Sequence, residues 1–528
     1  MAVDRGSPSD DRELVEPEIR NANTAVGAAV GDIVRTTLGP TGMEKMLADT
    51  NGMVLITNDT KTILGELGVN LNLLPSARLL REMAVEQNDE FGDGAATAVV
   101  LAGELLRNAS ELFEKGMHPT TVAEGYQLAA QRAATEITNA GIEVAVDDTE
   151  RLEQVVRTAI AGSGSVEDDA SLASLLVTAA EELAAAGDLR WDRLTVKKVP
   201  GGTMADSFLT RGNVIEGDPV HAGMPRILEP GRVVCLNANL TPPQLDETSA
   251  EQGQVVVRDA DEFDSLLDAE TETLRSKVES VVESGANAVF SNKSIDERAQ
   301  QEFADRGILA LRRMATSDME NVAHATGADI ADPGLVEPTD LGDAVRIEHQ
   351  TLGGEDVISI ETETADRVSL VLRGGTTQSL NEMERAARSG FGALRTLHAE
   401  ERQFVPGGGA AEIRASLVLR EETNRTNDRQ QLAVEAFADA LETIPRSLAQ
   451  NAGLDPVGTV AELRYRHGSG ERTVGINALE RRTGDVVASG IVDPVGIKRQ
   501  AVTAAADVVN RIVRIDDVIE AETTDEIE

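Results

Sequence analysis

The residues with the clearest capacity for chemistry are Gly92-Asp93-Gly94, which come directly before an apolar run over residues 98–106. This pattern predicts a glycine turn at the start of a helix. Unpaired backbone N–H groups and the positive end of the peptide dipoles attract an anion there, and glycine lets the backbone approach it. Asp93 would then hold Mg²⁺, which proteins commonly bind through one or two carboxylates plus substrate phosphates. An ordinary turn capped by Asp93 explains the same residues, so a phosphate site needs partners elsewhere in the chain.

Length and charge narrow the classes of protein that fit. A chain of 528 residues is too long for one core and predicts about three or four domains. The formal net charge of −42 repels nucleic acid and acidic lipid, which argues against DNA, RNA or membrane partners. Only eight of the 49 basic residues are lysines, yet 41% of the chain is apolar. This composition favours a folded protein of a salt-rich cytoplasm over a disordered one, because salt screens the repulsion.

The single cysteine and the composition of the N-terminus both bear on the compartment in which the protein works. The single cysteine, Cys235, excludes an intrachain disulfide framework and a CxxC metal site. It lies in the apolar run Val233-Val234-Cys235-Leu236, which predicts a small buried core residue. Residues 1–12 are polar and charged, and no apolar run reaches 18 residues. We therefore expect a soluble, cytoplasmic protein.

Secondary-structure patterns differ between the ends and the middle of the chain. Helical periodicity near both ends flanks a middle region of short strands alternating with helices, which predicts one domain built from both ends with a mixed domain inserted. Residues 241–272 interrupt the strand pattern of the middle region before a helix begins at about residue 261. The expected helices are 25–37, 96–106, 120–140, 171–185, 295–306, 431–453 and 494–513, and the expected strands 53–57, 211–224, 232–236, 288–291 and 308–312.

A resemblance to a known family covers nearly the whole chain. The segment Val34-Arg35-Thr36-Thr37-Leu38-Gly39-Pro40-Thr41-Gly42-Met43-Glu44-Lys45-Met46-Leu47 is similar to the signature of group II chaperonins, the archaeal thermosome and its eukaryotic cytosolic relatives. Further similar motifs follow in the family's order: Ile56-Thr57-Asn58-Asp59, Gly92-Asp93-Gly94, Arg373-Gly374-Gly375-Thr376, Glu384-Arg385-Ala386, Gly407-Gly408-Gly409-Ala410, Gly453-Leu454-Asp455-Pro456, Gly475-Ile476-Asn477 and Arg514-Ile515-Asp516-Asp517-Val518-Ile519.

This resemblance implies a multidomain fold of helices and mixed α/β structure. A mainly helical equatorial domain would comprise residues 1–147 and 405–528, a small intermediate hinge domain residues 148–215 and 369–404, and an α/β apical domain residues 216–368. The interrupting segment 241–272 resembles the family's helical lid. Such subunits form two stacked rings around a folding chamber, bind ATP and Mg²⁺, and act on unfolded proteins.

The resemblance also assigns site residues. It implies nucleotide binding by the three glycine-rich motifs and two later polar residues, with Asp93 as the Mg²⁺ ligand and Asp59 as a candidate catalytic carboxylate. The full nucleotide-binding set is Leu38, Gly39, Pro40, Gly92, Asp93, Gly94, Ala95, Ala96, Thr97, Gly408, Gly409, Asn477 and Asp493.

Departures from the family pattern fall on phosphate chemistry. Ser389 stands where the family's E-R-x-x-x-D motif has the aspartate that positions or deprotonates the attacking water. A serine hydroxyl cannot act as that base at neutral pH, and the loss of a general base typically lowers the rate by about 10²- to 10⁴-fold. Ser163 stands where a lysine is thought to sense the γ-phosphate, and Ala95-Ala96 replace two threonines. Thr60 replaces a glycine, and Thr41 a basic residue.

Four functions remain open from the sequence. The first is a chaperonin subunit with weak or no hydrolysis of its own, beside competent sister subunits. The second is a fully active folding ATPase that uses Asp59. The third is a hydrolysis-independent holdase or structural ring protein. A small-molecule kinase is disfavoured because the chain has no Walker A motif. A shifted register around residue 388 is the alternative explanation for Ser389, although it restores no carboxylate.

Overall fold

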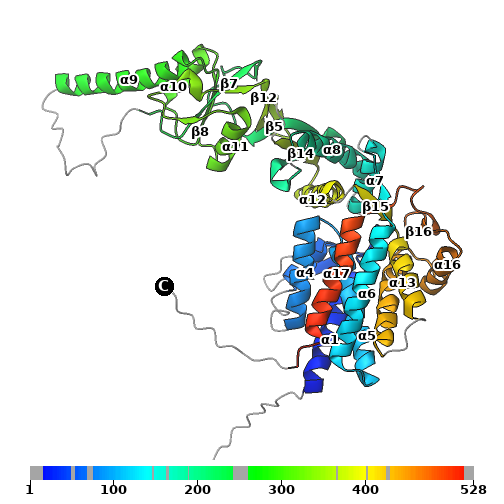
Figure 1. Ribbon diagram of the computed structural model, residues 1–528. Helices are drawn as coiled ribbons and strands as arrows, with labels where there is room; N and C mark the ends of the chain where they lie inside the picture. The colour runs from blue at the N-terminus through cyan, green and yellow to red at the C-terminus, as the bar shows by residue number, and fades with distance from the viewer. Residues whose placement is uncertain are drawn as a thin grey trace, which may run out of the picture. The chain divides into compact units, whose positions relative to one another are not determined.

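The computed structural model describes residues 16–48, 54–67, 75–145, 148–161, 166–187, 189–241, 260–363, 367–399, 402–423 and 429–516. The chain divides into two compact units (Figure 1). The first comprises Met1–Ala173 and Ala386–Glu528, and the second Ser174–Arg385. The first unit therefore contains both ends of the chain, with the middle inserted between them. The finer division into five segments stays a prediction.

Helix α5 (Ala95–Glu114) forms the centre of the first unit. It is apolar on nearly every side, so almost its whole length is buried, and it packs against helices from both ends of the chain. The helices packed against one another around it are α1 (Glu16–Arg35), α4 (Pro75–Phe91), α6 (Pro119–Asn139), α13 (Ala410–Thr423), α14 (Gln430–Leu441) and α17 (Val495–Ile512).

Helices α1 and α5 cross at a pair of glycines. A Cβ atom added to Gly31 would lie 2.9 Å from the Cα of Gly103, and one added to Gly27 would meet Leu106. The two helices are therefore antiparallel. The end of α1 consequently lies beside the start of α5, where the Gly92-Asp93-Gly94 turn is.

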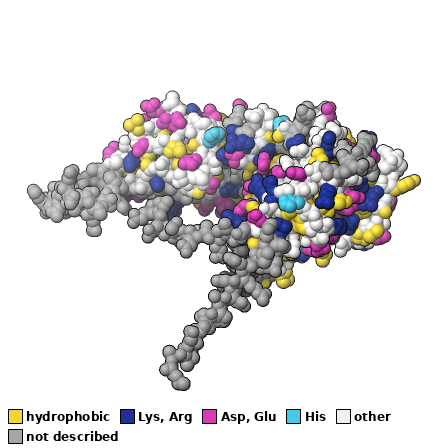
Figure 2. Space-filling model, turned by 60° about the horizontal axis from the view of Figure 1, so that its bottom comes forward, with side chains coloured by type: hydrophobic (Ala, Val, Ile, Leu, Met, Phe, Trp, Pro, Cys, Tyr) yellow, Lys and Arg dark blue, Asp and Glu magenta, His cyan; other side chains and the backbone are white. Residues whose placement is uncertain are grey.

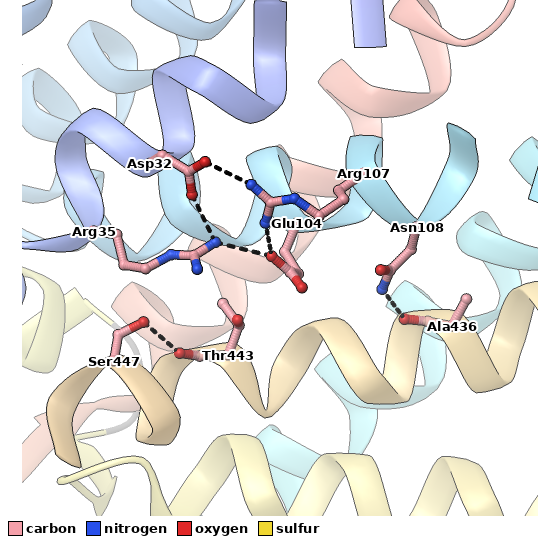
Figure 3. A network of polar contacts seen from close by, with 8 residues as sticks. All are labelled: Asp32, Arg35, Glu104, Arg107, Asn108, Ala436, Thr443 and Ser447. Atoms are coloured by element: carbon pink, nitrogen blue, oxygen red, sulfur yellow. Dashed lines mark hydrogen bonds and ion pairs between the residues drawn. The ribbon is translucent and has the colours of Figure 1, made fainter. Parts of the chain in front are cut away.

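Ion pairs reinforce this crossing (Figure 3). The Arg35 guanidinium lies 2.9 Å from the Glu104 carboxylate and 3.0 Å from Asp32, and Arg107 pairs with both acids. Asn108 of α5 donates a 2.9 Å hydrogen bond to the carbonyl of Ala436, which ties α14 to the same helix. Polar contacts thus fix the axial position of α1 on α5, while the apolar core supplies most of the packing.

The rest of the first unit consists of small sheets and shorter helices. Strands β1 (Lys45–Ala48) and β2 (Val54–Thr57) form an antiparallel pair, and β15 (Gln403–Pro406) lies between β18 (Val492–Pro494) and β3 (Ile142–Glu143). Strand β16 (Val474–Asn477) pairs with β17 (Arg482–Asp485). The remaining helices are α2 (Thr60–Glu66), α7 (Thr149–Ile160), α15 (Thr443–Asn451) and α16 (Pro456–Gly468), together with α8 (Val166–Ala185) and α12 (Thr377–Ala399), which also extend into the second unit.

Two sheets organise the second unit. The first has parallel strands β10 (Ile330–Ala331), β7 (Gly231–Leu236), β8 (Ala288–Ser291) and β9 (Leu309–Leu311), with β11 (Gly342–Ala344) antiparallel to β7. Its helices are α9 (Ala260–Glu283), α10 (Glu297–Asp305) and α11 (Thr316–Thr326). The second sheet has the order β4 (Leu194–Pro200), β14 (Val368–Gly374), β5 (Phe208–Glu216), β13 (Glu355–Glu361), β12 (Arg346–Leu352) and β6 (Ile227–Leu228). This confirms the expected mixture of helical and α/β structure.

Three local predictions can be compared with the structure, one for a cysteine, one for a strand and one for a helix. Cys235 is fully buried in β7, as predicted, and burial raises the pKa of its thiol to about 12. The strand expected over 211–224 was wrong beyond Glu216, because Gly217 and Pro219 end the ladder there. The single helix expected over 431–453 is two helices, since Pro445 lacks the N–H that a continuous helix requires and instead begins a new first turn.

Most of the expected lid segment lies outside the described residues, which resume at Ala260 with α9. Further along α9, Leu274, Val278 and Val281 are buried in the core of the second unit, so they are ordinary core residues. Among the helices that the structure describes, none combines the length and the apolar character needed to cross a membrane. Figure 2 shows one face of the molecule, on which acidic and basic side chains are interspersed rather than segregated.

Candidate functional site

A cavity of about 450 Å³ opens in the first unit where segments far apart in the sequence meet. It is lined by the loop after α1, the start of α5, the α7–α8 region and the segments around β16 and β18. Eight of the residues expected to bind nucleotide line it: Leu38, Gly39, Pro40, Asp93, Thr97, Gly408, Asn477 and Asp493. Among the described residues, the other five, Gly92, Gly94, Ala95, Ala96 and Gly409, belong to the adjoining turns and do not face the cavity.

The loop Leu38-Gly39-Pro40 forms one wall. The side-chain amide of Asn451, from the end of α15, donates hydrogen bonds to the carbonyls of Arg35 at 3.1 Å and Leu38 at 2.8 Å. These bonds give a partner to the last carbonyl of α1 and to a carbonyl of the loop that follows it. The loop is therefore held against the first unit by a residue more than 400 positions away.

The Gly92-Asp93-Gly94 turn forms the second wall. Gly92 and Gly94 have φ angles of +76° and +87°, a region that side chains disfavour, which explains both glycines. Gly94 is the N-cap of α5, so the helix begins where the sequence predicted. The Asp93 carboxylate accepts a 2.6 Å hydrogen bond from the Gly94 N–H, while the Gln87 amide donates to the Asp93 carbonyl at 2.9 Å. The turn thus presents both a carboxylate and a helix start to one side of the cavity.

The triple glycine shapes the third wall. A Cβ atom on Gly408 would lie 2.4 Å from the carbonyl oxygen of Ile476, so only glycine allows this approach between the loop and β16. The Ile476 N–H donates to the Gly408 carbonyl at 2.9 Å. Asn477, the next residue, caps the following turn by accepting a 3.1 Å hydrogen bond from Glu480.

A buried lysine that lines the cavity lies between two carboxylates. The Lys498 ammonium is 3.0 Å from Glu412 and 3.1 Å from Asp493, and its side chain is only 11% exposed. Burial works against the ammonium charge, but the Asp493 and Glu412 carboxylates outweigh it and raise the pKa of Lys498. Lys498 is therefore a permanent cation of the site.

The surroundings of Asp93 disfavour the negative charge of its carboxylate. Burial and then repulsion from Asp493 raise the pKa of its carboxyl to about 6, against the opposing effects of the Gly94 N–H and Lys498. A site that disfavours its own carboxylate charge is one in which an added cation is favoured. The Asp93 carboxylate offers oxygen ligands of the kind that Mg²⁺ prefers, and it lies at the start of a helix, where a phosphate group would bind. This arrangement fits a nucleotide bound together with Mg²⁺.

The candidate catalytic residues have separate positions. Asp59 is the N-cap of α2, where its Oδ2 accepts hydrogen bonds from the backbone and the hydroxyl of Thr62 at 2.7 and 2.6 Å. It is not among the described residues that line the cavity. Ser389 lies on α12, and its carbonyl oxygen would be 3.3 Å from a Cβ on Gly92. The backbone at position 389 therefore lies beside the aspartate turn, but Ser389 is not among the described residues that line the cavity. Ser163 lies outside the described residues.

Three charged cavity residues were missed from the sequence: Lys498, Arg157 and Asp169. Lys498 had a usable signal, because a lysine in the first turn of a helix opposes the helix dipole and suggests a specific anionic partner. Arg157 and Asp169 lie in polar helical segments, and nothing in the neighbouring sequence indicates that either residue belongs to a binding site.

The mixed helix-and-sheet fold, with a glycine-walled cavity assembled from segments near both chain ends, is consistent with the class of chaperonin subunits. The chain belongs to the TCP-1/cpn60 chaperonin family, whose sequence model matches residues 30–523. This confirms the resemblance on which the fold and site expectations were based.

Thermosome subunits are among the relatives. The chain is 39% identical over 514 residues to thermosome subunit alpha of Halobacterium salinarum and to thermosome subunit 1 of Haloferax volcanii, covering 97% of this chain and 90% of each relative. It is 38% identical over 520 residues to the thermosome subunit of Methanopyrus kandleri, covering 97% of this chain and 94% of the relative. The similarity to group II chaperonins therefore extends through both units.

Proposed function

We propose that this chain is a thermosome-type subunit that binds ATP with Mg²⁺ in the cavity and assists the folding of unfolded proteins inside a double ring. The observation that carries the proposal is the cavity itself, where Leu38–Pro40, Asp93, Gly408 and Asp493 meet although up to 455 positions separate them. The net charge of −42 and the two relatives from Halobacterium and Haloferax support a salt-rich cytoplasm as its setting.

Each wall has a part in nucleotide binding. The start of α5 offers N–H groups and a positive dipole end to phosphate oxygens. Asp93 would hold Mg²⁺, which neutralises phosphate charge when bound. Lys498 stays protonated between Asp493 and Glu412 and offsets the acidic floor of the cavity. The exposed Leu479 and buried Ile444 and Ile476 give the cavity an apolar side suited to a base.

Hydrolysis by this subunit is proposed to be slow. Position 389 reaches the Gly92 turn but carries a hydroxyl, which is a far weaker base than a carboxylate at neutral pH. Asp59 is already engaged as a helix cap, which argues against the fully active alternative. A hydrolysis-independent holdase would not need a cavity of this composition.

Nucleotide titration in molar KCl tests the proposal. Mg-ATP should bind to the wild type, and Asp93→Asn should weaken Mg-ATP binding more than ten-fold while changing metal-free ATP binding little. Asp507→Asn, which removes an exposed carboxylate from α17, is the control. Absence of Mg-ATP binding to the wild type would overturn the proposed function, and equal affinities for Asp93→Asn and wild type would overturn the role of Asp93.

The β1–β2 pair supports assembly. Among the residues that the structure describes, it is a sheet of two strands, and Met43, Met46 and Val54 expose 66%, 70% and 54% of their surface. Open strand edges with apolar side chains pair with other chains. Met46→Asp should shift the protein from rings to smaller species in analytical ultracentrifugation, whereas Thr135→Asp, which adds the same charge at an exposed position of α6, should not. Intact rings of Met46→Asp would exclude this hairpin as a ring contact.

A further inference from the structure

The cavity contains a carboxylate and a cation that the family motifs do not supply. Both come from the α7–α8 region, and both lie in the unit that holds the rest of the site. We propose that Asp169 and Arg157 serve as the general base and the γ-phosphate cation for the slow ATP hydrolysis of this subunit. This inference rests on the proposed nucleotide site and names the residues that act in it.

Helix α7 turns one face toward the cavity. Gln154, Arg157, Thr158 and Ala161 all line it, and positions three and four apart share a helix face. Thr158 holds this face in place, because its hydroxyl accepts a 3.1 Å hydrogen bond from the Val492 N–H. Its one proton is shared between the Gln154 carbonyl of α7 at 3.0 Å and the Gly490 carbonyl at 3.3 Å. Since Val492 is next to Asp493, the α7 face is fixed to the wall that carries Asp493 and Lys498.

Asp169 lies in the first turn of α8 and lines the same cavity. Its carboxyl is half-buried. Burial and, next, repulsion from Asp168 raise its pKa to about 6. The other charged groups that line the cavity are Arg157, Lys498, Asp93 and Asp493. A carboxylate with this pKa is ionised at pH 7.5 and is a stronger base than an ordinary aspartate, which suits proton abstraction from water.

Arg157 brings a positive charge to the mouth of the cavity. It pairs with Glu153 one turn earlier on α7 and keeps 43% of its side chain exposed. A guanidinium has five donors in a planar fork, so one carboxylate partner leaves donors for a phosphate. This is the charge that the family's lysine contributes and that a serine at position 163 lacks.

Asp169 and Arg157 have separate parts in the hydrolysis of the bond between the β- and γ-phosphates. The oxygen of water forms a bond to the γ-phosphorus while the bond from that phosphorus to the β–γ bridging oxygen breaks. The bridging electron pair leaves with ADP, and inorganic phosphate forms. The Asp169 carboxylate takes the proton of the attacking water and releases it to solvent after phosphate departs. Arg157 stabilises the charge on the γ-phosphate oxygens as the bond breaks.

Turnover and binding measured separately test the inference. Asp169→Asn should lower steady ATP turnover in molar KCl about 10²- to 10⁴-fold. Its affinity for Mg-ATP, measured with the same protein, should stay within about two-fold, because asparagine keeps the shape. Arg157→Gln should weaken ATP binding more than ADP binding. The turnover of the wild type should rise with pH through about 6, where both Asp169 and Asp93 lose their protons, and level off above pH 7.

The neighbouring residues provide matched controls. Asp168→Asn should keep the plateau turnover of the wild type, because Asp168 is not among the described residues that line the cavity. Glu153→Gln should keep the preference for ATP over ADP. Ser389→Asp in the Asp169→Asn background should restore turnover, which shows that this variant is folded.

The outcomes separate two failures. If the wild type binds Mg-ATP and Asp169→Asn hydrolyses ATP as fast as the wild type, the inference is overturned and the proposed function stands. Mg-ATP binding without any measurable turnover of the wild type would do the same. Loss of Mg-ATP binding by the wild type would overturn the proposed function first.

Discussion

Gly92 and Gly392 touch backbone to backbone. A Cβ atom on Gly92 would lie 2.8 Å from the Cα of Gly392, and one on Gly392 would lie 2.7 Å from the Cα of Gly92. Real Cβ atoms do not approach other atoms so closely. The turn that carries Asp93 and the helix that carries Ser389 are therefore packed without a side chain between them, which is why the backbone at position 389 lies beside this turn.

This contact predicts the effect of Gly392→Ala. Alanine raises helix propensity by about 1 kcal/mol, but overpacking a rigid contact costs about 1–3 kcal/mol. We expect the clash to dominate, because the opposing atoms are the Phe91 carbonyl and the Gly92 backbone rather than a flexible side chain. The Asp93 turn should shift, and calorimetric titration should show weaker Mg-ATP binding.

Gly65→Ala is the control for this prediction. Gly65 lies within α2, and a Cβ atom added there would have no neighbouring atom within 4 Å, so alanine meets open space. This variant should be at least as stable as the wild type and should bind Mg-ATP unchanged. Unchanged nucleotide binding by Gly392→Ala would show that α12 does not set the shape of the turn.

Ser389→Asp should raise ATP turnover at least ten-fold. The substitution places a carboxylate beside the Gly92 turn, where the family motif has one, and general-base catalysis typically contributes about 10²- to 10⁴-fold. The gain is expected to be at the lower end if Asp169 already acts as a base. Phosphate release in molar KCl measures it. Arg388→Asp, one residue away on the exposed side of α12, should give no gain.

Lys498→Met should destabilise the first unit by about 3–5 kcal/mol, the usual result of removing one partner from a buried ion pair. Glu412 is 2% exposed and Asp493 13%, so both carboxylates would be left buried without their cation. Urea unfolding followed by circular dichroism measures the loss. Lys115→Met, at an exposed site after α5, should change stability by less than about 0.5 kcal/mol. A loss below about 1 kcal/mol for Lys498→Met would mean that the carboxylates find other partners.

Local signals account for the part of the site that the sequence predicted. The glycines around Asp93 and the apolar run after them mark the start of α5 within a few residues, and Val54–Thr57 reads as a strand from its own composition. Asp169 and Arg157 could not be found this way. Their place in the cavity depends on long-range contacts such as the hydrogen bond from Thr158 to Gly490, which a short window of sequence does not contain.

His467 combines burial with an incomplete set of hydrogen bonds. The residue is 2% exposed, and its Nε2–H donates a 2.7 Å hydrogen bond to the Val474 carbonyl. Among the described residues, Nδ1 has no hydrogen-bond partner. The imidazole is therefore neutral, and a second proton on Nδ1 would be buried without an acceptor. Burial lowers the pKa of His467, the Arg414 and Arg466 charges lower it further, and the Val474 bond and Glu471 oppose this.

The consequence is a loss of stability in acid. The unfolded imidazole takes up a proton near pH 6.5, whereas the folded one does so only at lower pH, so the unfolded state binds more protons below about pH 6.5. Stability is thus fully present above about pH 6.5 and falls below it by at most about 1.4 kcal/mol per pH unit. Hydrogen exchange of the buried β16 amides, corrected for intrinsic rates, should show this protection loss in the wild type between about pH 7.5 and 5.5. His467→Gln should flatten the pH dependence, whereas His398→Gln, at an exposed position near the end of α12, should retain it. An unchanged slope in His467→Gln would assign the acid sensitivity to other groups.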